Sequence, residues 1–222
     1  MVAVPPGYWI DATEVTKAQY AAWLSTEPSI AAQQQFCSFN TTFIPGCDWP
    51  PTGDSSHPVV GVDWCDANAY CKGVGKRLCG RIGGGSTDYN AYADATTSQW
   101  YHACTAGGQN DYPYGDTYQP HTCNGNEDQH TGCDGGVCSS SAVASLSGCQ
   151  SSIPEYAGVF DMSGNVYEWE DACEASNGAT DACHVRGGSF FGDGPMALRC
   201  DSGLIAQRNS DWSHICGFRC CR

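Results

Sequence analysis

Sixteen cysteines are the side chains in this sequence with the most chemistry to offer. In a chain of this length they could hold zinc or form disulfides. A zinc site needs close pairs such as C-x2-C, and none occurs. Among the closer spacings are Cys65/Cys71, Cys133/Cys138 and the adjacent Cys220/Cys221. We therefore expect disulfides formed in an oxidising compartment, and Cys37–Cys47 and Cys173–Cys183 are two candidate pairings that cysteine order alone does not fix.

The charge of the chain narrows its possible partners and its location. Its formal net charge is −14 and it has only 10 lysines and arginines, which are scattered. Binding to phosphates requires clustered basic residues, so nucleic acid is excluded as a partner. No apolar run is long enough to span a membrane. No export signal follows Met1, so we expect the natural precursor to carry one and the mature protein to be extracellular, periplasmic or on the cell surface.

Local signals predict three helices and several short strands. Thr16 and Gln19 form a capping-box pattern that begins a helix running to about residue 26. A second helix is expected over 64–74 with Gly75 at its C-terminal cap, and a third over 97–105. The strand-like pieces are residues 8–10, 159–161, 166–169, 185–191 and 217–220. Between residues 189 and 216 the hydrophobic residues recur neither every second residue, as in a strand, nor every 3.6 residues, as in a helix. The demands of folding alone therefore do not explain the composition of this segment.

Seven segments, in order, resemble the formylglycine-generating enzyme family. The segments are Tyr8–Thr16, His57–Val60, Gly75–Leu78, Tyr112–Asp116, Asp161–Trp169, Arg186–Phe190 and Gly217–Arg219. The resemblance implies an α+β fold related to that of C-type lectins, loop-rich and stapled by several disulfides, with residues 1–222 as a single domain. The chain departs from the family by inserting residues 79–96 before the third helix. Within the Asp161–Trp169 segment we expect Val166 and Trp169 to face the core, which would leave Asn165 and Glu168 free to bind.

The resemblance also shows which residues the chain would need in order to act as an enzyme of this family. In the family two cysteines, three and eight residues after the serine of the Gly-Gly-Ser motif, bind copper and oxidise a substrate cysteine. Here these positions are Gly192 and Ala197, which offer no thiolate, so copper is not expected. A related branch uses a histidine-rich iron centre, and no clustered histidine pattern is present, so iron is not expected either. Cys200 is the nearest thiol, and we expect it in a structural disulfide. We expect no catalytic residue.

Calcium is the metal that the resemblance does imply. One family site would use Asn165, the carbonyl of Val166 and Glu168, and a second would use Asn124 and Gly125. Carboxylate and carbonyl oxygens on bent loops suit this hard cation. The alternative is that Asn165 only bonds the backbone of a turn.

The segment between the Gly-Gly-Ser motif and the terminal Gly-Phe-Arg also resembles the variable region of proteins that retroelements diversify. This resemblance implies a ligand-binding face at about residues 190–215, with a protein or a carbohydrate as its ligand. The expected ligand-binding residues are Phe191, Gly192, Asp193, Pro195, Met196, Leu204, Ile205, Asn209, Asp211, Trp212 and His214. The alternatives are a copper-dependent oxidase of the formylglycine-generating type, or a degenerate relative of that enzyme.

Overall fold

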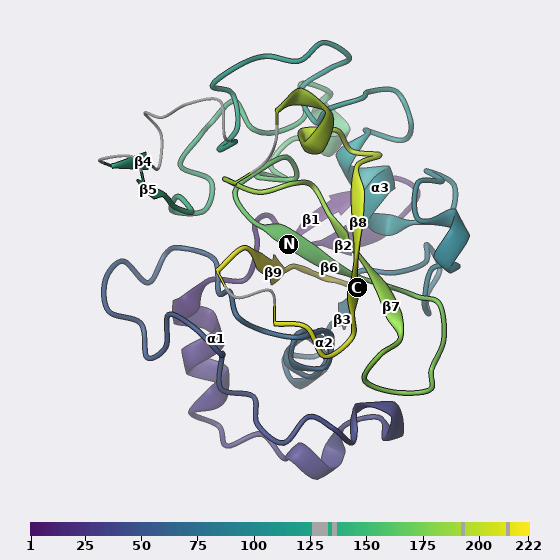
Figure 1. The fold of residues 1–222 in the computed structure, drawn as a ribbon. Coiled ribbons are helices and arrows are strands. Elements are labelled where there is room, and N and C mark those ends of the chain that lie inside the picture. Colours follow the sequence, from purple (N-terminus) through teal and green to yellow (C-terminus); the bar gives the residue numbers. More distant parts are fainter. Residues whose placement is uncertain (126–132, 135–136, 192–193, 212–213) are drawn as a thin grey trace.

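The computed structural model describes residues 1–125, 133–134, 137–191, 194–211 and 214–222, with the backbone alone at 133–134 and 137–138. Three of the predicted ligand-binding residues, Gly192, Asp193 and Trp212, lie outside the described residues. In Figure 1 a twisted sheet crosses the middle of the molecule, with α1 and α2 below it and the turn η5 above it. No helix within the described residues is long and apolar enough to cross a membrane.

All three predicted helices are present, and each begins within two residues of its expected start. They are α1 (Lys17–Leu24), α2 (Trp64–Gly73) and α3 (Gln99–Cys104). Thr16 Oγ1 accepts a hydrogen bond from the Gln19 backbone amide, and Gln19 Oε1 accepts one from the Thr16 backbone amide, so the predicted capping box is confirmed. Gly75 takes a φ of +75° just after α2, which any side chain would disfavour. Short 3-10 turns fill the loops at η1 (Ile30–Ala32), η2 (Gln35–Cys37), η3 (Tyr89–Ala91), η4 (Pro154–Tyr156) and η5 (Pro195–Leu198).

Ten strands form three sheets in the described part of the chain. The first sheet has the order β1-β2-β10-β3, which places both chain ends in it: β1 (Val2–Val4), β2 (Tyr8–Ile10), β10 (Cys220–Cys221) and β3 (Arg77–Leu78). The second has the order β8-β7-β6-β9: β8 (Gly203–Gln207), β7 (Ala182–Arg186), β6 (Tyr167–Cys173) and β9 (Cys216–Phe218). A separate hairpin joins β4 (Cys133–Asp134) to β5 (Val137–Cys138). In the second sheet β6 is central and parallel to β9, whereas β8 is an edge strand.

Two strand predictions need correction. Residues 159–161 form no strand, because only a single bridge pairs Phe160 with Gln150. The strand expected at 185–191 ends at Arg186, because Gly187 and Gly188 then turn with φ of +87° and +75°. A Cβ at Gly188 would lie 2.5 Å from the Ala197 carbonyl oxygen, so the close approach of η5 to this turn requires glycine.

Aromatic rings and buried aliphatic side chains join the helices to the second sheet. The rings of Tyr20 and Tyr70, from α1 and α2, stack with centroids 5.5 Å apart, and Tyr70 meets Phe218 of β9 edge-on at 5.4 Å. Val166 and Trp169 are fully buried, as predicted. This packing fixes β6, which carries Glu168, and β9, which Arg219 directly follows.

Among the described side chains six disulfides are formed, with sequence separations from 10 to 149 residues. They are Cys37–Cys65, Cys71–Cys220, Cys79–Cys221, Cys104–Cys200, Cys123–Cys149 and Cys173–Cys183. The predicted Cys173–Cys183 pair is confirmed. The Cys37–Cys47 pairing is wrong, because η2 packs against the first turn of α2 and brings Cys37 to Cys65. Within the described side chains Cys47 and Cys216 are free thiols.

The inserted residues 79–96 cover the outer face of the second sheet. The Tyr92 ring stacks on His184 of β7 with centroids 3.9 Å apart, and the Arg186 guanidinium lies 4.7 Å from the centre of the same ring. Burial lowers the pKa of His184 to about 4, so the imidazole stays neutral under this cover. The insertion therefore buries polar side chains of β7 that would otherwise face solvent.

Candidate binding face and the polar network beneath it

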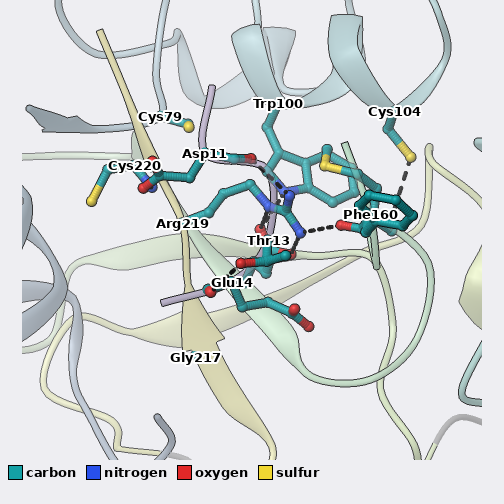
Figure 2. A network of polar contacts seen from close by, with 12 residues as sticks. Asp11, Thr13, Glu14, Cys79, Trp100, Cys104, Phe160, Gly217, Arg219 and Cys220 are labelled. Carbon is teal, nitrogen blue, oxygen red and sulfur yellow. Dashed lines mark hydrogen bonds and ion pairs between the residues drawn. The ribbon is translucent and has the colours of Figure 1, made fainter. Parts of the chain in front are cut away.

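The residues of the family motifs meet in a buried network around Arg219 and Glu168. Arg219 donates from Nε to Glu168 Oε2 and from Nη2 to Oε1, both at 2.7 Å, and both side chains are buried. Trp100 of α3 adds a third hydrogen bond, from Nε1 to Glu168 Oε2 at 2.9 Å. Figure 2 shows the Arg219 side chain with the Phe160 carbonyl on one side and Asp11 on the other, and it donates to the carbonyl oxygens of both. This pair joins the chain end to β6, α3 and the loop after β2.

Asn165 forms the second part of the network. Its backbone has a φ of +59°, which Asn tolerates better than most residues. Its amide Nδ2 donates to Glu14 Oε1 at 3.0 Å, and its Oδ1 accepts from Asn124 Nδ2 at 3.1 Å and from the Ser141 amide at 2.8 Å. Asn165 and Glu168 are thus not left free by the fold, since both are buried and both bond to other parts of the chain.

Two further buried carboxyls lie beside this network without a cation of their own. Burial, followed by the charges of Asp161 and Glu168, raises the pKa of Glu14 well above its usual range. Burial likewise raises the pKa of Asp161 to about 6, although the Ala144 amide donates to it at 2.6 Å. Glu14 Oε2 and Asn124 Oδ1 are buried acceptors with no hydrogen-bond partner.

These contacts bear on how the predicted calcium ligands could work. In the described side chains no group of three or more His, Cys, Asp or Glu is placed to hold a metal ion. Both oxygens of Glu168 are occupied by Arg219 and Trp100, so this carboxylate does not fit a calcium site as it stands. The two unpartnered oxygens belong instead to Glu14 and Asn124, next to Asn165. Val166 is packed with Val60 and Phe190, and Gly125 lies against Leu198.

Of the two positions that correspond to the copper-binding cysteines of the family, only one can be located. Gly192 is outside the described residues, and Ala197 lies on η5 with its carbonyl against Gly188. Cys200, the nearest thiol, forms a disulfide with Cys104 of α3, as predicted. Near this position the described chain therefore presents no thiolate to a soft metal ion.

Above the network, the predicted binding segment carries exposed apolar side chains. Phe191 is 64% exposed, Met196 73%, Leu204 42% and Ile205 53%. These four are half of the eight large hydrophobic side chains that are exposed in the described chain. Leu204 and Ile205 are consecutive in β8, opposite Val185 and His184, so their side chains point to opposite faces of the sheet. Exposed hydrophobic side chains concentrated in one segment of a chain are candidates for contact with a partner. We call these four residues the apolar patch.

The backbone under the apolar patch is firmly held. Arg199 pairs with Asp111 at 2.7 Å and with Asp201 at 2.8 Å, and the Cys104–Cys200 disulfide fixes the residue between them. Tyr112 Oη donates to the Pro195 carbonyl at 3.0 Å. A loop held in this way loses little conformational freedom when a partner binds.

Two of the other predicted ligand-binding residues, Asp211 and His214, lie beside a different loop, whereas Pro195 is on η5. His214 donates from its backbone amide to Cys47 Sγ at 3.1 Å, and its ring lies 3.7 Å from Asp48. A Cβ at Gly46 would lie 2.5 Å from Asp211 Oδ2, so this loop also contacts Asp211. Asn209 is exposed, at the turn after β8. The loop at 44–48, with Ile44 59% exposed, is a neighbour that sequence reasoning missed, because nothing in its composition points to residue 214.

Comparison with known families matches residues 1–222, the whole chain, to the sulfatase-modifying factor enzyme 1-like domain. The chain belongs to this family. Formylglycine-generating enzymes of Thermomonospora curvata and Streptomyces coelicolor are 30% identical over 141 residues and 25% identical over 267 residues. The first alignment covers 57% of this chain and 39% of the relative, and the second covers 96% and 77%. The chain thus spans about two fifths of the Thermomonospora relative that it matches.

Three solved structures share the fold of this sulfatase-modifying factor enzyme 1-like domain. They are CarF (TM-score 0.63, 23% identity, 97% of this chain and 85% of that one), PvdO from Pseudomonas aeruginosa (0.65, 20%, 100% and 82%) and variable protein 1 of Treponema denticola (0.56, 16%, 96% and 84%). At these identities the likeness concerns the fold alone. The predicted α+β fold of the formylglycine-generating enzyme type is confirmed.

Proposed function

We propose that this chain is a binding domain that presents the apolar patch to a protein partner outside the cytoplasm. The observation that carries the proposal is the exposure of Phe191, Met196, Leu204 and Ile205 on a segment braced by a disulfide and two ion pairs. Buried in an interface, such side chains would supply the dehydrated centre that most binding energy depends on. Aliphatic groups favour a protein surface over a carbohydrate. The six disulfides are consistent with an oxidising location.

The similarity in fold to variable protein 1 of Treponema denticola supports one origin for such a surface. We propose that the segment 191–215 is diversified by a retroelement. The coding DNA tests this idea: a near-repeat of the segment with adenines at its variable codons, and a reverse transcriptase gene nearby, are expected. A locus with neither feature would refute diversification and leave the binding proposal standing.

A selection experiment tests the binding proposal itself. The oxidised protein is immobilised and used to select binders from a displayed library of small folded domains. The selected binders are then tested on Phe191→Ser/Met196→Ser and Leu204→Ser/Ile205→Ser variants, with Val74→Ser as a control that removes a side chain of similar exposure (39%) from the end of α2. The proposal predicts weaker binding to the patch variants only. Binders whose affinity for both patch variants equals their affinity for the wild type would contradict the proposal.

Membership of the family keeps one enzymatic alternative open to test. A copper-dependent oxidase of the formylglycine-generating type would convert the cysteine of a peptide to an aldehyde. We expect no conversion of that cysteine to the aldehyde beyond a protein-free control when the protein is incubated with copper(I), oxygen and a cysteine peptide, because Gly192 and Ala197 replace the two copper ligands. Copper-dependent oxidation by the protein, detected by mass spectrometry, would refute this expectation.

Calcium remains a proposal for the network below the face. Its support is the pair of unpartnered buried oxygens, Glu14 Oε2 and Asn124 Oδ1, and the raised pKa of the Glu14 and Asp161 carboxyls. A divalent cation there would neutralise buried negative charge that Arg219, already paired with Glu168, does not.

A further inference from the structure

A separate cavity of about 380 Å³ lies at the other end of the molecule, between α1, α2 and the segment 28–37. In Figure 1 these elements lie below the central sheet, whereas η5 lies above it. The volume is within the range of about 300–1,000 Å³ that small-molecule sites commonly have. None of the four apolar-patch residues lines this cavity.

One face of α2 forms the floor of the cavity. The lining residues of this helix are Cys65, Asn68, Ala69, Lys72 and Gly73. Their spacing of three and four residues places them on one side of the helix. In most packed helices this side would contact another element directly, but here the segment 28–37 passes over it and leaves a space.

The roof over α2 is held in place, so the cavity is preformed. The Cys37–Cys65 disulfide ties the end of the roof to the helix. Gln33 donates to the Asn40 carbonyl at 3.0 Å, and Asn40 Nδ2 donates back to Gln33 Oε1 at 3.2 Å. A ligand would therefore enter an ordered site and would not have to order the loop itself.

The interior is mainly apolar and contains one polar side chain from the inner part of α2. Trp23, Phe43 and the Cys37–Cys65 disulfide supply apolar walls. Asn68 is only 7% exposed and lines the cavity. A side-chain amide that faces a cavity can donate to and accept from a ligand, which gives a mainly apolar site a point of specificity.

The mouth of the cavity adds a positive charge. Lys72 lies one helical turn beyond Asn68 on the same side of α2, and it is exposed. No ion pair links it to a carboxylate in the described part of the chain. The protein as a whole repels anions, because its net charge is −14. A lysine at the mouth of the cavity would attract an anionic group of a ligand locally in spite of this charge.

We propose that this cavity is a binding site for a small amphipathic organic anion. The apolar or aromatic body of the ligand would lie against Trp23 and Phe43, whose rings pack together with centroids 5.1 Å apart. Its hydrogen-bonding group would meet Asn68, and its carboxylate or sulfonate would face Lys72. The proposal does not depend on the proposed function, because it concerns other residues.

The test uses 8-anilinonaphthalene-1-sulfonate as the probe, titrated into the oxidised protein and followed by fluorescence and calorimetry. We expect saturable binding with one site. Ala69→Phe would fill the cavity and weaken binding by roughly tenfold or more, whereas Ala22→Phe, on the exposed side of α1, would leave it unchanged. Ala32→Trp in the roof is a second blocking variant, used if Ala69→Phe lowers the melting temperature.

The charge requirement is tested separately. Lys72→Glu is expected to weaken binding of the sulfonate probe by roughly tenfold. The same substitution should leave binding of the neutral N-phenyl-1-naphthylamine unchanged. Absence of saturable binding, or equal binding by the folded blocking variants, would overturn the proposal. The proposal would also be overturned if only the Leu204→Ser/Ile205→Ser variant lost binding of the probe, because the dye would then lie on the apolar patch.

Discussion

Replacing Glu168 by glutamine should strongly destabilise the protein. Arg219 is fully buried, and Glu168 supplies its two shortest hydrogen bonds, both 2.7 Å. The substitution keeps the size of the side chain but leaves the guanidinium without its counter-ion and turns an amide N–H toward a donor. The remaining acceptors of Arg219, the carbonyls of Asp11 and Phe160, carry no full charge.

The expected cost follows from the burial of this pair. Breaking a buried ion pair by removing one partner costs about 3–5 kcal/mol, mainly because an uncompensated charge stays buried. In a chain of 222 residues each kcal/mol corresponds to about 2–4 °C in melting temperature. The melting temperature should therefore fall by roughly 6–20 °C.

Denaturant unfolding of the oxidised protein, with all disulfides intact, provides the assay. Glu155→Gln is the control, because it makes the same chemical change on an exposed side chain and should alter the free energy of unfolding by less than about 0.5 kcal/mol. Glu168→Gln combined with Arg219→Met should recover much of the loss, since both charges are then absent. A single variant as stable as the control, or a double variant with additive losses, would refute the reasoning.

Three other perturbations follow from the structure. Burial raises the pKa of Asp63 and Asp161 to about 6 and of Glu170 to about 7, so the folded state binds protons more tightly than the unfolded chain, and these contributions to stability are lost as pH rises through those values. The lowered pKa of His184, about 4, acts in the opposite direction, and because three groups outweigh one the urea midpoint should be higher at about pH 5 than at about pH 7.5. A midpoint that rises with pH across this range would contradict that sign. Cys104→Ala/Cys200→Ala opens a link between residues 96 apart and should cost about 4–5 kcal/mol, whereas Cys173→Ala/Cys183→Ala, with a separation of 10, should cost less; equal losses by denaturant unfolding would argue against the loop-entropy reasoning. Removal of calcium by a chelator should lower the melting temperature of the wild type but not of Glu14→Gln, and an unchanged wild-type transition would exclude the calcium proposal.

Local signals in the sequence were enough to predict the helices. Thr16 with Gln19, and Gly75, each act within a few residues of a helix end, and the structure confirms both. Strand β8 could not be predicted, because Leu204 and Ile205 are adjacent and both exposed, which gives no alternation. An edge strand is defined by its partner β7, whose position the sequence does not reveal.

The candidate site was predictable in its residue types but less so in its contacts. The core positions of Val166 and Trp169 predict that Glu168 is free to bind, but its partner Arg219 lies 51 residues away in the sequence and is brought to it only by the fold. The same limit applies to Cys37, whose partner depends on how η2 packs against α2. Long-range pairing of this kind depends on tertiary packing, which the spacing of residues does not encode.

The central claim is that the apolar patch is a binding face on a scaffold of the sulfatase-modifying factor enzyme 1-like family. Hydrogen exchange of the protein, free and saturated with a selected binder, tests it most directly. If the apolar patch is the binding face, amide exchange in peptides covering 190–207 should be slower in the bound than in the free protein. Exchange in peptides covering 20–37 and 64–73, which line the separate cavity, should be the same in both. Protection confined to those latter peptides, or spread evenly over the chain, would contradict the claim.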